Sequence, residues 1–406
     1  MLEQLFPKYH RRYSASPHVK ELRAFARWLT EVGYGRDPAH DHVRRLREAL
    51  DLRGRRLQAR IDRTGVDDLF ARLPDIATYR ATCRAFVRCL EACGRLVAEP
   101  DRRPHAATLV GYEYQLRTVR GLSNSTVTQH LATVQAFLDE ALPGDSPISA
   151  LTRASIEQHL VTTGRRISRQ SMQHCVARLR SFLRFCHSNS LLAQPLDAID
   201  TPRVYRDELP PRALPWRIVT GLLRSIDRST ATGWRDYTIL HLMSHYGLRP
   251  SEVVLLRLDA IDWQTCTLRV VQCKTRSVLM LPIDARTLRI IKRYLCDGRP
   301  GSDRPELFLR ARGPAGPMKH YAVCNIYQTR AARSGLDLQG TSAYSLRHSF
   351  AMRLLDRGVG IKAIGDVLGH RGLESTCVYL RLQLDALRDV ALPLPRMALA
   401  KTAEGA

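Results

Sequence analysis

The chain has 406 residues and a hydrophobic content of 44%, which allows two or three domains with their own cores and excludes wholesale disorder. Its 63 lysine and arginine residues outnumber 39 acidic residues and give a formal net charge of +24. Such an excess repels itself within a compact fold, so it favours a polyanionic partner such as duplex DNA over an ordinary solvated surface in an arginine-rich protein.

The first hundred residues are predicted to be helical. Apolar residues recur at helical spacing in the first long helix, at Leu22, Phe25, Leu29 and Val32. A second, basic helix is expected over 42–63 and a third over 76–97, before the polar break EPDRRPHA. Because no catalytic pattern lies in this stretch, residues 1–105 are interpreted as a helical N-terminal extension of unknown role.

The next segment, 106–195, is predicted to form a compact basic bundle of four short helices. The first helix ends near Gly121, and Ser123 is placed to cap the second. Two more helices are expected over 152–163 and 169–190. The last of them has a long apolar stripe, at Met172, Cys175, Val176, Leu179, Phe182 and Leu183.

A linker and a third unit complete the chain. Residues 196–215 include the proline-rich stretch DTPRVYRDELPPRALP, which is typical of an extended linker. Residues 216–392 open with helices near 216–227 and from 234 to 246, and the alternating segment TLRVVQCKTRSVLMLPI then predicts a β-hairpin before helices resume. Residues 393–406 are interpreted as a flexible tail. The expected fold class is mainly α with a small β-sheet (α+β).

Cysteine usage and hydropathy indicate where the protein works. The ten cysteines are scattered, with no Cys-x-x-Cys pair and no histidines that complete a zinc pattern, so small buried thiols in a reducing cytoplasm are expected. The start MLEQLFPKYHRRY lacks the apolar core of a signal peptide, and no stretch of about 18 apolar residues predicts a membrane span. We therefore expect a cytoplasmic protein with no metal site and no membrane partner.

Arg249 and Lys274 are the first candidates for chemistry in the third unit. Gly247 can end one helix and Pro250 can open the next, which would present Arg249 at a helix junction beside amide groups suited to an anion. Lys274 stands in the turn of the predicted hairpin. Taken singly, an arginine on an ordinary surface and a solubilising lysine are the commoner explanations.

Two later motifs add four candidates. Tyr344 and Arg347, in the segment YSLRHSF, are three residues apart and therefore share one face of a helix start. His370 ends the motif Leu-Gly-His, and Tyr379 follows it in the segment STCVYLR. Taken singly, His370 would be a helix cap and Tyr379 a half-buried aromatic, which is the usual fate of such residues.

In this order and at these intervals, the motifs together resemble the catalytic signature of tyrosine site-specific recombinases, the phage integrase family, and in particular its Xer-like members. The signature comprises Gly-Leu-Arg-x-x-Glu, a hairpin lysine, Leu-Arg-His, Leu-Gly-His and a later tyrosine. The resemblance covers about 106–392. Within it, 106–195 is similar to the family's core-binding domain, which clamps DNA, and 216–392 is similar to its mixed catalytic domain.

The resemblance implies a role for each catalytic candidate. Arg249 and Arg347 would hold the non-bridging oxygens of a phosphodiester, and His370 would donate a further hydrogen bond. Tyr379 would attack phosphorus to form a 3′-phosphotyrosine. Lys274, carried on the hairpin, would protonate the leaving 5′-oxygen as general acid.

One position departs from the family's pattern. The family most often has histidine three residues before its second arginine, where this chain has Tyr344. A phenol still donates a hydrogen bond to phosphate, but it cannot serve as an imidazole base near neutral pH. His348 is not a substitute by position and is interpreted as structural support, and Glu252 is interpreted as orienting Lys274 or Arg249.

The resemblance also implies cofactors and partners. Since the covalent link conserves the energy of the phosphodiester bond, neither ATP nor a metal ion is expected. The implied partners are double-stranded DNA with specific recombination sites and further protomers, as a homo-tetramer on DNA or a hetero-assembly with related recombinases, at the nucleoid. The reaction would serve integration, excision, transposition or resolution of a mobile element. The apolar segment after Tyr379 would pack on its own domain or dock on a neighbouring protomer.

Two other functions fit part of the pattern. A type IB topoisomerase uses a similar set of residues to relax supercoils without exchanging partners, but the separate helical bundle and the interval from Leu-Gly-His to Tyr379 favour a recombinase. A DNA-binding regulator that has kept the fold and lost cleavage would account for Tyr344. The other catalytic positions are all filled, which favours an enzyme.

Overall fold

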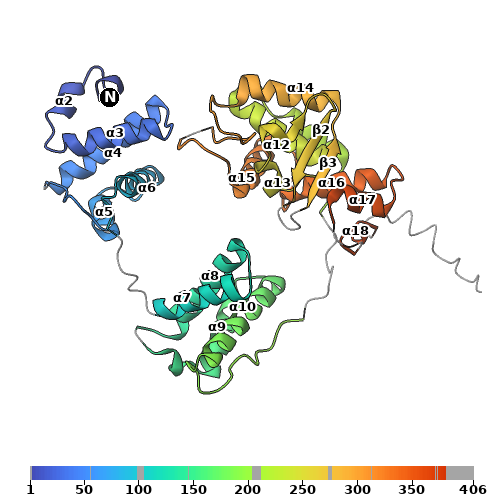
Figure 1. The fold of residues 1–406 in the computed structure, drawn as a ribbon, viewed down its shortest axis with the longest axis horizontal. Coiled ribbons are helices and arrows are strands. Elements are labelled where there is room, and N and C mark those ends of the chain that lie inside the picture. Colours follow the sequence, from blue (N-terminus) through green and yellow to red (C-terminus); the bar gives the residue numbers. More distant parts are fainter. Residues whose placement is uncertain are drawn as a thin grey trace, which may run out of the picture. The chain divides into compact units, whose positions relative to one another are not determined.

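The structure, a computed structural model, describes residues 2–54, 56–97, 105–144, 146–203, 212–272, 277–311, 313–370, 372 and 374–380. The chain divides into two compact units, one combining 1–58 and 67–93 with 209–406, the other combining 59–66 with 94–208. Both are built mainly of helices, and a small sheet lies in the first, which confirms the expected fold class (Figure 1). No helix among the described residues has both the length and the apolar character that a membrane crossing requires.

The N-terminal residues are helical as expected, and those that the structure describes form six helices where three were predicted. These are α1 (Leu2–Leu5), α2 (His10–Ser14), α3 (Val19–Glu31), α4 (Arg36–Arg53), α5 (Arg63–Phe70) and α6 (Ala77–Ala92). In α3 the side chains of Leu22, Phe25 and Leu29 are fully buried, as their spacing predicts. They pack against buried residues of α4 and α6, so this segment has a core of its own.

Two helix bounds in this segment were predicted wrongly. The helix expected over 42–63 runs from Arg36 to Arg53, because Pro38 fits the first helical turn and Gly54 ends the helix in left-handed backbone with φ 67°. The helix expected over 76–97 ends at Ala92.

The second unit contains a helical bundle. Its elements are α7 (Ala106–Tyr114), a π-helical turn η1 (Gln115–Val119), α8 (Asn124–Ala141), a short 3-10 turn η2 (Ile148–Ala150), α9 (Arg153–Gly164) and α10 (Arg169–Ser188). Ser123 caps α8 as predicted, because its hydroxyl accepts a hydrogen bond from the amide of Thr126. In the core Tyr112 donates to Ser181 at 2.9 Å, and burial raises the pKa of Tyr112 to about 12.

The remaining residues of the first unit carry the sheet. Its helices are α11 (Trp216–Arg224), α12 (Ala231–Tyr246), α13 (Pro250–Val254), α14 (Ala285–Arg293), α15 (His320–Arg333), α16 (Ala343–Leu355), α17 (Ile361–Leu368) and α18 (Glu374–Cys377), with short turns η3 (Leu258–Ala260) and η4 (Tyr294–Gly298). The predicted hairpin is present as two antiparallel strands, and a third strand extends it. The strands are β1 (Ile261–Asp262), β2 (Thr267–Val271) and β3 (Val278–Pro282), in the order β1-β2-β3.

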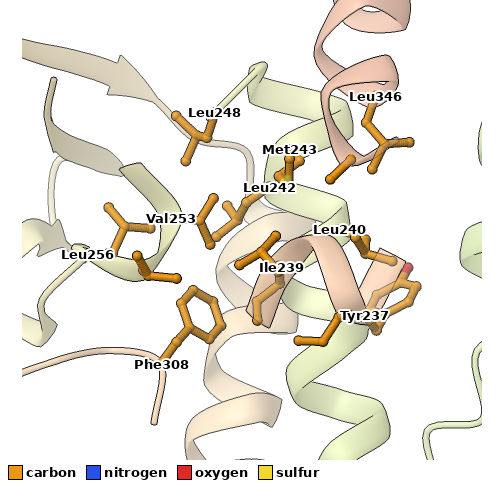
Figure 2. Close-up of a cluster of buried hydrophobic side chains, with 14 of the residues drawn as sticks. Tyr237, Ile239, Leu240, Leu242, Met243, Leu248, Val253, Leu256, Phe308 and Leu346 are labelled. Atoms are coloured by element: carbon orange, nitrogen blue, oxygen red, sulfur yellow. The ribbon is translucent and has the colours of Figure 1, made fainter. Parts of the chain in front are cut away.

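Helix α12 is the centre of this core. It begins at Ala231, earlier than the predicted residue 234, because the hydroxyl of Thr230 caps it by accepting from the amide of Gly233. Its side chains from Asp236 to Ser244 are all buried. Figure 2 shows apolar residues of α12 meeting those of α13, α16 and the chain after η4, at Ile239, Leu242, Met243, Val253, Leu346 and Phe308.

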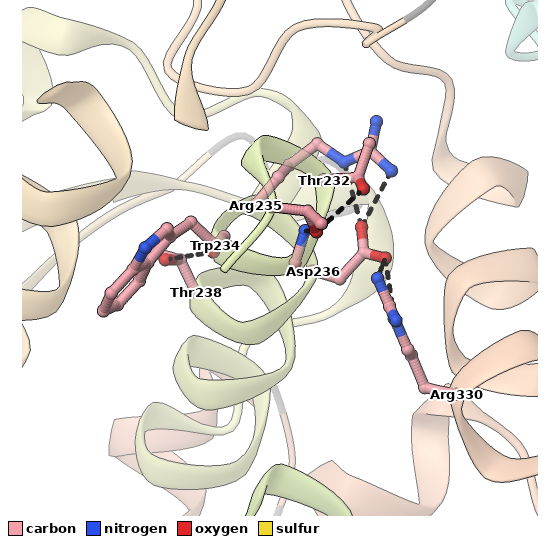
Figure 3. A network of polar contacts seen from close by, with 8 residues as sticks. Thr232, Trp234, Arg235, Asp236, Thr238 and Arg330 are labelled. Carbon is pink, nitrogen blue, oxygen red and sulfur yellow. Dashed lines mark hydrogen bonds and ion pairs between the residues drawn. The ribbon is translucent and has the colours of Figure 1, made fainter. Parts of the chain in front are cut away.

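A buried ion-pair network ties the start of α12 to α15 (Figure 3). One carboxylate oxygen of Asp236 accepts from Arg235 at 3.0 and 2.8 Å, and the other accepts from Arg330 at 2.9 and 2.6 Å. Because an unpaired buried carboxylate would cost several kcal/mol, both guanidinium groups are needed to keep Asp236 inside. The network holds α12 in place, and α12 ends at the candidate site.

Candidate active site

The junction between α12 and α13 positions Arg249. Gly247 ends α12 with φ 65°, in the left-handed region that favours glycine. A Cβ at Gly247 would lie 2.6 Å from Cδ1 of Phe350 in α16 and 2.8 Å from Cδ2 of Leu368 in α17. Glycine therefore allows both the turn and the close approach of these helices. Arg249 follows as the N-cap residue of α13, with its side chain 18% exposed.

Glu252 is a buried carboxylate that holds Arg249. Its Oε1 lies 2.5 Å from Nη1 of Arg249, and its Oε2 accepts from the backbone amide of Arg249 at 2.8 Å. The same Oε2 is 3.9 Å from Nη1 of Arg347. One carboxylate therefore stands between two guanidinium groups, which leaves a surplus of positive charge for an anion.

Arg347 joins three segments of the site. Its Nη1 donates to the carbonyl of Gly247 at 2.5 Å, and its Nη2 donates to the carbonyl of Leu368 at 2.7 Å. Nη2 also lies 3.2 Å from Nε2 of His370. Burial, and next the charge of Arg249, lower the pKa of Arg347 to about 10, so the side chain remains a cation at neutral pH.

His370 follows the end of α17. Its Nδ1 lies 2.8 Å from the hydroxyl oxygen of Thr376, at the start of the segment that carries the tyrosine. Burial, and next the charges of Arg347 and Arg249, lower the pKa of His370 to about 4, so the imidazole is neutral at pH 7. The sequence motifs did not single out Thr376, although its position one helical turn before Tyr379 could have indicated a place beside the site.

Tyr379 lies against the same cluster, two residues after the end of α18. The ring is 2% exposed and belongs to a small core with Phe350, Ile364 and Leu368. Its hydroxyl, however, contacts a polar side chain, since Oη lies 3.1 Å from Nδ1 of His348. Burial raises the pKa of Tyr379, and the charges of Arg347 and Arg249 act against that rise. The structure thus brings the predicted arginines, His370 and Tyr379 together.

Tyr344 borders this cluster and is half exposed. It lies one turn before Arg347 in α16, and 45% of the residue is exposed. Burial of the remainder raises the pKa of Tyr344, while the charges of Arg249 and Arg347 lower it. The phenol is therefore protonated at neutral pH and is able to donate a hydrogen bond.

Lys274 lies outside the described residues, but the hairpin strands on either side of it are described. Gln272, next to the end of β2, is buried, and its Nε2 lies 3.5 Å from the carbonyl of Leu368, the same oxygen that Arg347 binds. The Ser277 hydroxyl donates to Oε1 of Gln272 at 3.2 Å. The hairpin is thus anchored beside the site through Gln272, a residue that sequence reasoning also missed.

The chemistry of this cluster suits an anionic ester. Two guanidinium groups, one carboxylate and neutral imidazoles lie in one cluster with a buried phenol, so the site can attract a phosphodiester and present a nucleophile to it. Among the described residues, no group of three or more His, Cys, Asp or Glu side chains could hold a metal ion.

Comparison with known sequences identifies relatives of the chain. Residues 219–385 match the model of the phage integrase family. A protein named as an integrase/recombinase, y4rA of Sinorhizobium fredii, is 32% identical over 389 residues, which cover 94% of this chain and 90% of the relative. The tyrosine recombinase XerD of Listeria innocua is 28% identical over 229 residues, covering 55% of this chain and 75% of the relative.

Solved structures share the fold. A lambda integrase dimer bound to a COC′ core site superposes with a TM-score of 0.53 at 17% identity, covering 67% of this chain and 94% of that one. The Tn1549 transposon integrase in complex with circular intermediate DNA also gives a TM-score of 0.53, at 16% identity, covering 70% of this chain and 99% of that one. At these identities the likeness concerns the fold alone.

Proposed function

The chain belongs to the phage integrase family of tyrosine recombinases, and we propose that the cluster of Arg249, Arg347, His370 and Tyr379 is its reaction centre. As a member of this family it is a site-specific DNA recombinase. It cleaves and rejoins strands through a phosphotyrosine intermediate, without metal ion or ATP. The observation that carries the assignment is Arg347, which binds the segments of Gly247 and His370 while its charge acts on Tyr379.

In this proposal the two arginines hold the scissile phosphate. Arg249 is the more exposed of them and meets the non-bridging oxygens first, and Arg347 contributes its charge from the buried side. Charge grows on these oxygens in the transition state, so donors that are already in place stabilise it strongly. Glu252 fixes the orientation of Arg249 through its two bonds to that residue.

His370 is proposed as a further donor to the phosphate. When the Thr376 hydroxyl donates to Nδ1, the ring proton lies on Nε2, the nitrogen that faces Arg347. Nε2–H is then available to an oxygen held by the same arginine. Tyr344, which lies one turn before Arg347 in α16 and is half exposed, is proposed to donate as well, in place of the family's usual histidine.

Tyr379 is proposed as the nucleophile and Lys274 as the general acid. Attack by the Tyr379 oxygen on phosphorus forms a 3′-phosphotyrosine, and protonation by Lys274 lets the 5′-oxygen leave. The anchoring of Gln272 and Ser277 beside Leu368 supports the role of the lysine, since these residues bracket the segment that carries it.

We propose double-stranded DNA with specific sites as the substrate, bound by an assembly of protomers. The net charge of +24 supports a nucleic-acid partner. Lambda integrase, which shares the fold, is described as a dimer on a core site and as a tetramer on a Holliday junction. More specifically, we propose a homo-tetramer or a hetero-assembly with related recombinases. It would act on a mobile element at the nucleoid.

The domain roles are also proposals. Residues 106–195 would clamp DNA, and 196–215 would link them to the catalytic residues 216–392. The tail predicted over 393–406 lies outside the residues that the structure describes. Residues 1–105 would extend the enzyme beyond this core.

The test uses the full chain and nicked duplexes that tile the DNA flanking its gene. The nick releases the short strand with the 5′-hydroxyl, so cleavage traps the covalent protein–DNA adduct. We expect wild type to form an adduct that peptide mapping places on Tyr379, Tyr379→Phe to form none, and Tyr294→Phe, which removes a buried hydroxyl elsewhere in the unit, to retain it.

Two outcomes would contradict the proposal. Tight DNA binding with no adduct on any duplex would indicate a regulator without cleavage activity. Relaxation of a supercoiled plasmid that lacks the flanking DNA would indicate a topoisomerase, because that reaction requires neither a specific site nor a partner strand.

A further inference from the structure

The hydroxyl of Tyr379 lies against an imidazole. Its Oη is 3.1 Å from Nδ1 of His348, and the two rings are tilted by 56° with centroids 5.7 Å apart. When the ring proton lies on Nε2, Nδ1 accepts from the hydroxyl through its lone pair. Attack on phosphorus requires the phenolic proton to leave, and this contact offers it an acceptor at hydrogen-bond distance.

The other groups of the site are poorly suited to take this proton. Arg249 and Arg347 are cations with no free lone pair. His370 has no free lone pair when its proton lies on Nε2, because its Nδ1 then accepts from the Thr376 hydroxyl. Tyr344 is a phenol whose pKa is raised by burial, so it is itself protonated at neutral pH.

His348 is in the state that a base requires. It is half-buried in α16, directly after Arg347. Burial, and next the charge of Arg347, lower its pKa below the usual value, so its imidazole is neutral at pH 7. The titratable groups that act on His348 are Arg347, a cation, and, further along the site, His370, which is neutral. The positive charge that His348 would gain is offset by the negative charge that grows on the phosphate.

We propose that His348 is a catalytic residue whose Nδ1 takes the phenolic proton as Oη of Tyr379 attacks the scissile phosphorus. In cleavage, the Oη–H and P–O5′ bonds break, the P–Oη bond forms, and the 5′-oxygen takes a proton from the general acid assigned to Lys274. Rejoining reverses each step, and the imidazolium returns its proton to the oxygen of Tyr379. The inference rests on the proposed function and adds the base that Tyr344 does not supply.

The decisive variant is His348→Asn. An asparagine carbonyl oxygen falls near the place of Nδ1, so the variant keeps an acceptor for the Tyr379 hydroxyl but cannot hold its proton. Single-turnover cleavage of the nicked duplex is expected to slow by about 100-fold at pH 7. The wild-type rate should fall only at acid pH, through the lowered pKa of His348. The variant should lose that acid limb and gain rate steadily as pH rises, because hydroxide then removes the proton.

A second substrate separates the base from the acid. In a duplex whose 5′-bridging oxygen is replaced by sulfur, the leaving group departs without a proton. This substrate should restore cleavage to Lys274→Ala and leave His348→Asn slow. Added imidazole should restore part of the rate to His348→Gly, where it can occupy the vacated volume. His10→Asn, in the N-terminal helices, is the control for loss of a histidine and should cleave at the wild-type rate.

Each remaining outcome decides between the proposals. If His348→Asn keeps the wild-type rate and pH profile, the histidine only positions Tyr379 and the inference is overturned. If the sulfur substrate rescues His348→Asn, the histidine acts on the leaving group and the inference is again overturned. If wild type forms no adduct on Tyr379, the proposed function itself fails. Should His348→Asn melt early, the imidazole rescue of His348→Gly carries the same test.

Discussion

Glu252 offsets two guanidinium groups with one buried carboxylate. It is bonded to the side chain and the backbone of Arg249 and lies 3.9 Å from Arg347. Glu252→Gln keeps the shape and removes the charge, which leaves two neighbouring cations without their counterion. We expect a loss of about 3 kcal/mol in the free energy of unfolding, measured by urea denaturation at pH 7.

The control for this change is an exposed pair. Asp259 lies 3.1 Å from Arg257, and both side chains are more than half exposed. Asp259→Asn should therefore cost less than about 1 kcal/mol, because solvent screens the pair. Equal losses for the two variants would mean that Glu252 does not offset the arginines.

Two stacked histidines in α12 predict a loss of stability in acid. The rings of His241 and His245 are 4.0 Å apart, and His241 is bonded to the Thr287 hydroxyl at 2.9 Å. Burial is the main cause of a lowered pKa in both residues, about 3 for His241 and about 4 for His245. In the unfolded chain both would titrate near pH 6.5. The unfolded state thus binds more protons below that pH, and the free energy of unfolding falls as pH drops from about 6.5 to 4.

The measurement compares urea unfolding at pH 7 and pH 5. His241→Gln removes one of the two groups, so the loss of stability between these pH values should shrink by about 2 kcal/mol. His320→Gln, an exposed histidine at the start of α15, should leave the loss unchanged. An unchanged loss in His241→Gln would show that this histidine is not held neutral.

At the scale of elements, the packing of α16 and α17 on Gly247 predicts a large effect of one methyl group. Gly247→Ala places a Cβ against Phe350 and Leu368, in backbone with φ 65°. Gly358→Ala meets the same kind of backbone, with φ 77°, but no atom of the described residues lies within 4 Å of the new Cβ. We expect about 1 kcal/mol of destabilisation at Gly358 and about 2 kcal/mol more at Gly247, by urea denaturation.

The same pair of variants tests the position of Arg249. Since a shift at Gly247 is passed to the start of α13, adduct formation should fall in Gly247→Ala and stay near wild type in Gly358→Ala. Equal adduct yields in the two variants would mean that the junction at Gly247 does not set the position of Arg249 in the reaction.

Elements whose signals are local could be predicted from the sequence. The cap at Ser123 and the hairpin around Lys274 each depend on residues that are neighbours in the chain, and both are present. The helix predicted over 42–63 failed because basic residues continue past its end, whereas Gly54 terminates it through backbone conformation.

Contacts between distant elements could not be predicted in this way. The motifs indicated Arg249, Arg347, His370 and Tyr379 because the family's pattern spaces them along the chain. The partner of Tyr379 at His348 and the place of Gln272 beside Leu368 depend on how the hairpin, α16 and α17 pack. Helical periodicity reports which face is buried, and it does not report which side chain that face meets.

At the scale of the whole molecule, the net charge of +24 predicts how binding responds to salt. Several acidic residues form surface ion pairs with an arginine one helical turn away. These pairs are Arg44–Glu48, Arg117–Glu113, Arg153–Glu157 and Arg293–Asp297. These pairs neutralise charge locally and leave an excess of cations for phosphates. Each phosphate contact releases condensed counterions from DNA, so the binding constant falls steeply with salt concentration.

The variant Tyr379→Phe allows this to be measured without covalent chemistry. Fluorescence anisotropy with an arbitrary duplex should show affinity falling by about a thousandfold between 50 and 200 mM salt, as expected for six or more phosphate contacts. A decline of tenfold or less would mean that the surplus arginines are engaged within the protein or point away from DNA. The affinity of such a protein for its recombination site would then have to come from base contacts, and it would survive at high salt.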